Sequence, residues 1–386
     1  MYSISVKTFA NLEPLLAAEL AALGATDIFP GKRVVHCTGD LSLVYRLNYE
    51  LRTGLRVLVQ LTSFKCRKPD DLHRKAMEFA WEDFMGLENT FSIDPNVRSA
   101  QYRHPHFAAL KLKDAIADRF VKLTGRRPDV NPDQPDVKIH LHIDEEKVTI
   151  SLDSSGNSLN QRGYRDSGGM APLNEVLAAA MIQFTGWKGD TPFYDPMCGS
   201  GTLAIEAAMI AGNIPSQWKR PRFGFMSWPA FDKTLWKTVV QDAHAKTNES
   251  TVPVYASDSD RMQLKQAARN ISLAGLTDRI HLSTEDFFVL DPHSDPGILV
   301  LNPPYGERMD EEQILHFYKR IGESFKHRWS GFKAWVISSN IEALKQIGLK
   351  SSKKVDLFNG NLPCRFQGYE LYAGSRRKPA EAEIAE

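Results

Sequence analysis

The stretch Ile298-Leu299-Val300-Leu301-Asn302-Pro303-Pro304-Tyr305-Gly306 decides how the second half of this chain folds. Its first four residues are a short apolar run, which is typical of a buried parallel strand, and the two prolines forbid the strand to continue. Asn302 is therefore expected at the carboxyl end of a central strand. Open α/β sheets bind their ligands at that edge.

The residues that follow this strand suit the recognition of an amino group. The side-chain oxygen of Asn302 and the carbonyl of Pro303 are two acceptors close together, so they could hold both protons of an exocyclic amine on a base. Such an amine is a poor nucleophile because its lone pair is delocalised, and two acceptors favour a tetrahedral nitrogen that can attack a methyl group. Pro304 completes the predicted catalytic set, and Tyr305 would stack on the base. The alternative is a surface turn, because Asn-Pro is a common turn former.

From residue 172 onward, short apolar runs alternate with amphipathic stretches. Strands that alternate with helices predict a parallel, doubly wound α/β sheet. We expect this domain over 173–374, followed by a charged tail over 375–386. The expected strands are 193–195, 254–256, 280–282, 298–301, 334–338 and 367–372, and the expected helices are 173–184, 202–211, 261–274, 311–327 and 341–347.

The first half has a different pattern, in which short strands and helices alternate over 1–62 and continue over 63–155. Residues 139–143 and 148–152 alternate strictly between apolar and polar positions, which predicts a hairpin with one buried face. His140 and His142 lie on the opposite face, where we expect solvated positions and not metal ligands. Residues 156–172, rich in Ser, Gly and Asn at their start, are the predicted linker between the halves.

Composition sets limits on the kind of protein. The net charge is +1 and basic and acidic residues balance in both halves, so any polyanion must bind through local patches. No run approaches the roughly 20 apolar residues of a membrane span, and the N-terminus resembles a strand and not a signal peptide. The cysteines, Cys37, Cys66, Cys198 and Cys364, have no paired spacing. We therefore expect a cytoplasmic protein with no zinc or other metal site.

A second constellation predicts a nucleoside cofactor. Residues 195–202 (DPMCGSGT) read as strand, glycine loop and helix, and Gly199 and Gly201 would let the backbone approach a ligand closely. Asp258 ends the next strand, where a carboxylate can bind ribose hydroxyls. The loop lacks the lysine of a P-loop, so it could hold the amino-acid part of S-adenosylmethionine, and Asp195 could bind the ammonium of that cofactor. A dinucleotide site is the competing interpretation. The predicted cofactor-binding residues are Asp195, Pro196, Cys198, Gly199, Ser200, Gly201, Thr202, Asp258, Asp286, Phe287 and Asn302.

These motifs, in this order, resemble class I S-adenosylmethionine-dependent methyltransferases that act on exocyclic amino groups. The resemblance implies a Rossmann-like domain with a seven-stranded, mostly parallel sheet. The Asn-Pro-Pro-Tyr form is shared by N6-adenine and N2-guanine enzymes, so it indicates the reaction and leaves the base open. The dinucleotide interpretation does not explain residues 302–305.

The first half narrows the resemblance. Residues 112–118 (LKDAIAD), 125–128 (GRRP), 151–156 (SLDSSG) and 161–165 (QRGYR) are similar to THUMP-domain RNA methyltransferases of the RlmL/YpsC-type group. That group methylates N2 of a guanosine in 23S ribosomal RNA. The resemblance implies an α+β region with a ferredoxin-like part over 1–62 and a THUMP domain over 63–155 that binds structured RNA. Longer relatives carry a second methyltransferase domain, so we expect this chain to lack their second activity.

Candidate RNA contacts are the basic residues near these motifs. Two arginines beside Tyr164 could bind phosphate, or they could be snorkelling charges at a strand edge. The insertion over 213–245 interleaves aromatic and basic residues, which suits single-stranded RNA, although a packing segment is slightly favoured. The predicted RNA-binding residues are Lys65, Arg67, Lys68, Arg126, Arg127, Arg162 and Arg165.

Three functions are compatible with the sequence. The first is methylation of a guanosine N2 in 23S ribosomal RNA. The second is guanine-N2 or N6-adenine methylation with transfer RNA as a substrate. The third is a non-catalytic RNA-binding ribosome-assembly factor that has kept a cofactor fold, and the intact chemical motifs argue against it.

Overall fold

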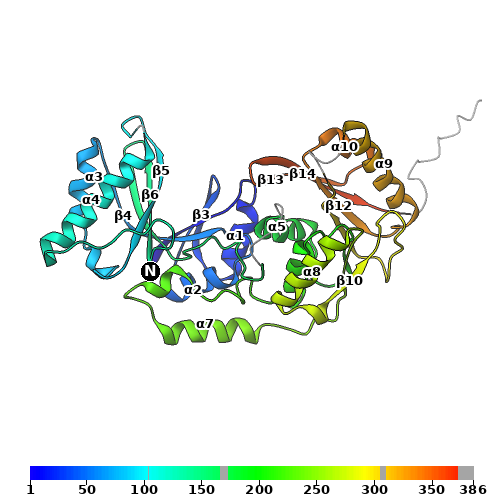
Figure 1. The fold of residues 1–386 in the computed structure, drawn as a ribbon, viewed down its shortest axis with the longest axis horizontal. Helices are drawn as coiled ribbons and strands as arrows, with labels where there is room; N and C mark the ends of the chain where they lie inside the picture. Colours follow the sequence, from blue (N-terminus) through cyan, green and yellow to red (C-terminus); the bar gives the residue numbers. More distant parts are fainter. Residues whose placement is uncertain (103, 166–172, 305–309, 373–386) are drawn as a thin grey trace, which may run out of the picture. The chain divides into compact units, whose positions relative to one another are not determined.

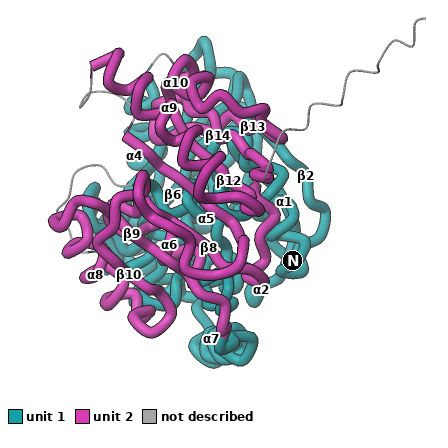
Figure 2. The backbone as a smooth tube through the Cα atoms, turned by 90° about the vertical axis from the view of Figure 1, so that its right-hand side faces the viewer, with its two compact units in different colours: residues 1–183, 209–249 teal, residues 184–208, 250–386 magenta. Residues whose placement is uncertain are grey.

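The computed structural model describes residues 1–102, 104–165, 173–304 and 310–372 (Figure 1). The chain divides into two compact units, which Figure 2 shows in two colours. Unit 1 consists of Met1–Gln183 and Met209–Glu249, and unit 2 of Phe184–Ala208 and Ser250–Glu386. Within the described ranges, no helix has both the length and the apolar character that crossing a bilayer requires.

Unit 1 is built on one seven-stranded sheet in the order β2-β3-β1-β4-β7-β6-β5. β4 joins its two parts, because this strand pairs with β1 on one side and with β7 on the other. The predicted boundary between residues 62 and 63 therefore falls within one continuous strand. The strands are β1 (Tyr2–Lys7), β2 (Thr26–Gly31), β3 (Val34–Gly39), β4 (Arg56–Lys65), β5 (Phe91–Arg98), β6 (Val137–Asp144) and β7 (Lys147–Asp153).

The helices of the first 155 residues pack on this sheet through their apolar stripes. α4 (Pro105–Thr124) places Leu112, Ile116 and Phe120 in the core and ends at Gly125, whose left-handed conformation (φ 75°) suits a residue without a Cβ. Figure 1 shows α3 and α4 beside each other near β5 and β6. The remaining elements are α1 (Glu13–Ala22), α2 (Leu41–Glu50), α3 (Pro69–Glu78) and the short 3-10 helix η1 (Trp81–Asp83).

The predicted hairpin is confirmed as β6 and β7, which pair Ile139 with Leu152. The expectation that His140 is solvated is wrong, because its exposed fraction is 5%. Its Nδ1 lies 3.4 Å from a carboxylate oxygen of Asp94 on the neighbouring strand β5. The nearby imidazole of His140 is the main cause that lowers the pKa of Asp94 to about 2. The polar face of the hairpin thus holds a partly buried contact between an imidazole and a carboxylate, which alternation of residue types alone does not predict.

The insertion over 213–245 is a packing segment that includes the 3-10 helix η2 (Gly224–Ser227) and α7 (Lys233–Ala245). The Phe225 ring centroid lies 4.5 Å from that of Tyr45 on α2, and the Trp236 centroid lies 5.9 Å from it. Arg220 is largely buried and donates to three carbonyls of residues 155–158. These contacts support the packing interpretation, because the aromatic rings stack on unit 1 itself.

Unit 2 contains the predicted seven-stranded sheet, in the order β10-β9-β8-β11-β12-β14-β13. All its neighbours are parallel except β14, which runs antiparallel to both β12 and β13. The fold class is therefore confirmed. The strands are β8 (Phe193–Asp195), β9 (Val254–Asp258), β10 (Ile280–Thr284), β11 (Ile298–Leu301), β12 (Lys333–Ser338), β13 (Lys353–Asn359) and β14 (Leu362–Glu370).

Helices cover this sheet at the predicted places. α9 (Glu311–His327) buries Ile321 and Phe325 in one cluster with Leu299 and Leu301 of β11. Asp310 caps its first turn, because the Asp310 carboxylate accepts from the Gln313 amide at 2.8 Å. The other elements of this unit are α6 (Thr202–Ala211), most of which belongs to it, α8 (Arg261–Ala274), α10 (Ile341–Gln346) and the 3-10 helix η3 (Thr277–Arg279); most of α5 (Glu175–Thr185) belongs to unit 1.

β11 enters the sheet through a glycine that has no space for a side chain. A Cβ on Gly297 would lie 2.0 Å from the carbonyl oxygen of Pro192. We predict that Gly297→Ala destabilises unit 2 by about 1–3 kcal/mol, because the backbone of β11 must shift. Thermal unfolding measures this change.

Gly86→Ala is the control, since a Cβ there meets nothing closer than the Asn89 side chain at 3.4 Å. Equal melting temperatures for the two variants would show that β11 moves away from residue 192 without strain.

Candidate active site

The two sequence motifs of the second half end on neighbouring strands. Asp195 is the last residue of β8, and Asn302 directly follows β11. These strands are adjacent and parallel, with Leu299 opposite Tyr194. Both functional side chains therefore lie at the same carboxyl edge of the sheet, as the sequence predicts.

Asp195 is fully buried, and neither of its carboxylate oxygens has a hydrogen-bond partner among the described residues. Burial raises the pKa of Asp195 well above its ordinary value, and the charge of Asp258 adds to the shift. The backbone amide of Ala204 favours the ionised carboxylate and opposes this shift. A buried carboxylate without a partner is costly, so it indicates a cationic or hydrogen-bonding ligand.

Asn302 shows the same signature. Its side-chain oxygen is buried and has no hydrogen-bond partner in the part of the chain that the structure describes. Pro303 is buried and Pro304 is exposed. Tyr305 lies outside the described residues, so its stacking stays a prediction. Two orphaned acceptors on adjacent strands thus mark this edge as a site whose ligand supplies the missing donors.

The glycine loop between β8 and α6 is shaped by two left-handed glycines, Gly199 (φ 52°) and Gly201 (φ 82°). Gly201 also lets the loop approach α8, because a Cβ there would lie 3.3 Å from Ala267. Pro196 and Thr202 are buried at the two ends of the loop. The loop backbone is therefore close to its neighbours, as the glycine pattern predicts.

Asp258 ties this loop to the second strand. Its carboxylate accepts hydrogen bonds from the amide of Gly199 at 2.9 Å and from the amide of Asp260 at 2.9 Å. The predicted acid at the end of β9 thus lies beside the glycine loop, where it can reach a ribose. Cys198 is buried and the pKa of its thiol is raised, first by burial, so we assign it no nucleophilic role.

Sequence reasoning missed Asn270. This residue is buried on α8 and donates from its side-chain nitrogen to the carbonyl of Ser200 at 2.9 Å. The available signal was a polar residue on the apolar stripe of α8, which Leu264, Ala267 and Ile271 define. Asn270 therefore holds the glycine loop by a hydrogen bond from α8.

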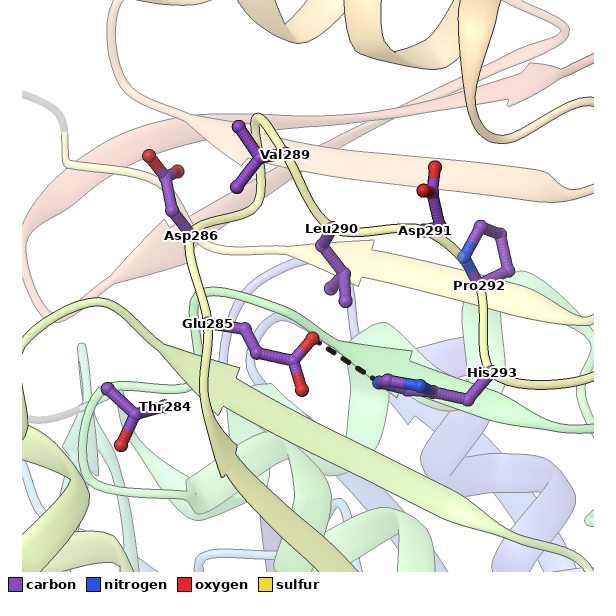
Figure 3. A pocket seen from close by; sticks show the side chains of 8 residues that line it. All are labelled: Thr284, Glu285, Asp286, Val289, Leu290, Asp291, Pro292 and His293. Carbon is purple, nitrogen blue, oxygen red and sulfur yellow. Dashed lines mark ion pairs between the residues drawn. The ribbon is translucent and has the colours of Figure 1, made fainter.

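The residues after β10 fit the prediction in part. Asp286 is exposed beside a hollow of about 560 Å³, and its side chain points away from the ion pair between Glu285 and His293 (Figure 3). Phe287 was predicted to cover an adenine ring. Its side chain is 2% exposed, and its ring centroid lies 5.9 Å from that of Trp329. Phe287 therefore belongs to the core, and that prediction is corrected.

The predicted RNA-binding residues divide into two groups. Lys65, Arg67, Lys68, Arg126 and Arg127 are exposed, and Arg127 lines a hollow of about 800 Å³ beside α4. Two of these arginines also lie near acidic side chains, with Arg126 3.1 Å from Glu88 and Arg67 3.9 Å from Glu146.

Arg162 and Arg165 both contact other residues of unit 1, and the predicted RNA contact of the partly exposed Arg165 stays a prediction. Arg162 is 1% exposed, and its guanidinium donates to the carbonyls of Arg52 at 2.7 Å and Leu159 at 2.9 Å. Arg165 lies 3.0 Å from the Glu175 carboxylate. The predicted RNA contact of Arg162 is therefore corrected, since its guanidinium does not reach the surface.

A fold of this topology, with orphaned acceptors at the ends of β8 and β11 and a glycine loop between acids, defines a class I methyltransferase. Three family models match the chain: the RMKL-like methyltransferase domain over residues 162–367, the THUMP domain over 66–153 and the RlmL ferredoxin-like domain over 3–58. The chain belongs to the RMKL-like methyltransferase family and is an S-adenosylmethionine-dependent enzyme.

Individual relatives agree with this assignment. The "Putative RNA methyltransferase slr0064" of Synechocystis sp. is 39% identical over 94% of this chain and 95% of its own length. A "Ribosomal RNA large subunit methyltransferase K/L" of Marinomonas sp. is 36% identical over 99% of this chain, and this chain spans about half (54%) of that relative.

Solved structures show the same architecture. "SMU.472, a putative methyltransferase complexed with SAH" has a TM-score of 0.86 and 27% identity, covering 98% of this chain and 99% of its own. A "predicted N6-adenine-specific DNA methylase" of Listeria monocytogenes has a TM-score of 0.86 and 30% identity, covering 97% of this chain and 96% of its own.

The residues of this edge fit S-adenosylmethionine. Asp195 offers a carboxylate for the ammonium, and Asp258 lies where a ribose can be bound. The described residues contain no group of three or more histidine, cysteine or acidic side chains that could hold a metal ion.

We predict that Asp195→Asn weakens binding of S-adenosylmethionine by about tenfold to a hundredfold, because it removes the charged partner of the ammonium. Isothermal titration calorimetry measures this loss. Binding to the wild type should also weaken as pH falls, because Asp195 must lose its proton to receive the cation. Unchanged affinity in the variant would exclude the ammonium role.

The same substitution changes how stability depends on pH. The raised folded-state pKa means that Asp195 favours folding at low pH, and this contribution is lost as pH rises through the folded-state pKa. The Asp195→Asn variant lacks that loss, so its melting temperature relative to wild type should rise with pH. Asp295→Asn, at an exposed position, should show a constant difference. A constant difference for both would contradict the buried charge.

We predict that Arg162→Lys lowers the stability of unit 1 by about 2 kcal/mol or more. The two terminal nitrogens of Arg162 donate to two different carbonyls, and the single ammonium of a lysine cannot reach both. Denaturant unfolding measures this change, and Arg127→Ala at an exposed position is the control. A stable Arg162→Lys protein with weakened RNA affinity would restore the original prediction.

Proposed function

We propose that this protein transfers a methyl group from S-adenosylmethionine to the exocyclic N2 amine of a guanosine in 23S ribosomal RNA. The observation that carries this proposal is that, within the part of the chain that the structure describes, the buried side-chain oxygens of Asn302 and of Asp195 on the neighbouring strand have no hydrogen-bond partner, with Pro303 buried beside Asn302. The printed names of the ribosomal RNA large subunit methyltransferase relatives support the choice of substrate. One solved neighbour carries an N6-adenine name, so the base must be tested directly.

When bound, S-adenosylmethionine supplies a methyl group that is attached to a positively charged sulfur. Transfer of the methyl group breaks the bond to this sulfur, which becomes a neutral thioether. The side-chain oxygen of Asn302 and the carbonyl of Pro303 accept the two protons of the target amine, which fixes its nitrogen and favours a localised lone pair. Tyr305 stacks on the base. The work of these residues is orientation, and well-oriented reactants can gain about 7–11 kcal/mol over a bimolecular encounter.

The target base must leave its stack before Asn302 can reach its amine. Unstacking costs a few kcal/mol, roughly, and least in a loop or bulge, so we propose a target in an irregular part of structured RNA. We keep the domain assignment as a proposal: a ferredoxin-like part over 1–62, a THUMP domain over 63–155, a linker over 156–172, the catalytic domain over 173–374 and a tail over 375–386. The exposed Lys65, Arg67, Lys68, Arg126 and Arg127 are the proposed RNA contacts.

The cytoplasm is the proposed place of action. The four cysteines are free and buried in the structure, which suits a reducing compartment. The proposed reaction needs no metal, because the cationic sulfur of the cofactor already activates the methyl group.

We predict that Asn302→Ala lowers methyl transfer by about a hundredfold or more while binding of S-adenosylmethionine stays within twofold, because the amine loses an acceptor made for the transition state. The test incubates the protein with labelled cofactor and unmodified 23S ribosomal RNA and identifies the methylated nucleoside by mass spectrometry. N2-methylguanosine is the expected product.

Asn96→Ala is the matched control, since Asn96 is an exposed asparagine on β5. N6-methyladenosine as the product, or methylation of unmodified transfer RNA in a parallel assay while the ribosomal RNA stays unmodified, would replace the proposed substrate with the second candidate. Full rescue of a deletion strain by the Asn302→Ala variant would instead favour a non-catalytic assembly factor.

A further inference from the structure

An arginine on α9 lies over an aromatic ring of the segment that follows β10. The guanidinium carbon of Arg320 lies 3.7 Å from the ring centroid of Phe288. Phe317, one turn earlier on α9, meets the same ring edge-on at 5.0 Å. Phe288 and Phe317 are half-buried and Arg320 is exposed. The guanidinium of Arg320 therefore lies over the partly exposed ring of Phe288.

This arrangement leaves the guanidinium edge available. Stacking uses the face of the planar group, whereas its N–H donors point outward in the plane and match two oxygens of a phosphate. Among the described residues, the side chain of Arg320 makes no ion pair or hydrogen bond, in contrast to Arg328 at the C-cap of α9, which lies 2.6 Å from Asp291. Arg320 is thus a preorganised cation without an acidic partner.

The local charge is favourable for a polyanion. The charges of α9 are segregated: the acids Glu311 and Glu312 lie in its first turn, whereas residues 316–327 carry Lys319, Arg320 and Lys326 against the single acid Glu323. All four of these later side chains are exposed. Local basic patches of this kind are what a nearly neutral protein needs to bind a phosphate backbone.

Both parts of the stack connect directly to the active-site edge. Phe288 follows Asp286 by two residues, in the segment that leaves β10, and the amide of Phe288 donates to the Asp286 carboxylate at 3.0 Å. α9 is the first helix after Asn302. Both partners of the stack thus belong to segments that follow the carboxyl ends of β10 and β11 along the chain.

We propose that the Arg320–Phe288 stack is an RNA-backbone clamp that holds a phosphate of the strand flanking the target nucleotide. This proposal rests on the proposed RNA substrate and adds to it a specific contact on the catalytic unit. Phe288 orients the guanidinium, and Arg320 makes the phosphate contact.

The test compares Arg320→Ala and Arg320→Lys with the wild type on unmodified 23S ribosomal RNA transcribed in vitro. Arg320→Ala should raise the KM for RNA about tenfold, the loss expected for one charge-assisted contact. The slope of log affinity against log salt should become shallower by about 0.7–0.9. Arg320→Lys should keep the salt slope and give an intermediate KM, because the charge stays and the planar fork is lost.

Arg328→Ala is the matched control, because Arg328 is a neighbouring arginine already paired with an acid. It should leave the KM and the salt slope unchanged. Affinity for S-adenosylmethionine and the melting temperature should match wild type in Arg320→Ala, which separates a substrate contact from a structural role of the stack.

Two results would overturn the clamp. An Arg320→Ala protein with wild-type KM and salt slope would exclude a phosphate contact, and a loss of cofactor affinity or stability that accounts for the KM would make the stack structural. RNA binding is measured separately from methylation, so a wild type that binds RNA but produces no N2-methylguanosine contradicts the proposed function alone.

Discussion

The rest of the catalytic unit depends on one buried carboxylate whose oxygens have no hydrogen-bond partner among the described residues. Asp195 lies at the carboxyl edge of β8, fully buried and beside the negative charge of Asp258. A protein could stabilise this position by replacing the acid with an apolar residue or an amide. The unfavourable free energy of burying this acid is offset when a cation binds to it, and the ammonium of an amino-acid cofactor is such a cation.

The surrounding backbone holds the space for that cofactor. Asp258 binds the amide of Gly199 from the second strand, and Asn270 binds the carbonyl of Ser200 from α8. Two neighbouring elements thus hold the glycine loop by one hydrogen bond each, which keeps it next to Asp195. β11 brings Asn302 to the same edge, with an acceptor that lacks a donor. The cofactor end and the base end of the site are therefore both prepared before any ligand arrives.

The sequence predicted much of this unit because its signals are local. The apolar run of β11, the prolines after it and the glycines of the loop between β8 and α6 each specify their own backbone. β13 was missed because it is an edge strand with a single buried residue, Leu357. Asn270 was missed because its partner lies 70 residues away, and a hydrogen bond across the fold leaves no periodic signal.

Charged residues were the least predictable part, since a basic side chain near a motif can serve a ligand or the fold. Arg162 serves the fold through main-chain carbonyls, whereas Arg320, which no motif singled out, is stacked and accessible. The central claim is that Asp195 and Asn302 open onto one ligand site. A crystal structure with S-adenosylhomocysteine tests it most directly. The account predicts an Asp195 oxygen about 3 Å from the ligand ammonium or from one bridging water, with the Asn302 oxygen facing the sulfur. A ligand bound elsewhere, or an Asn302 side chain turned away from the sulfur, would contradict it.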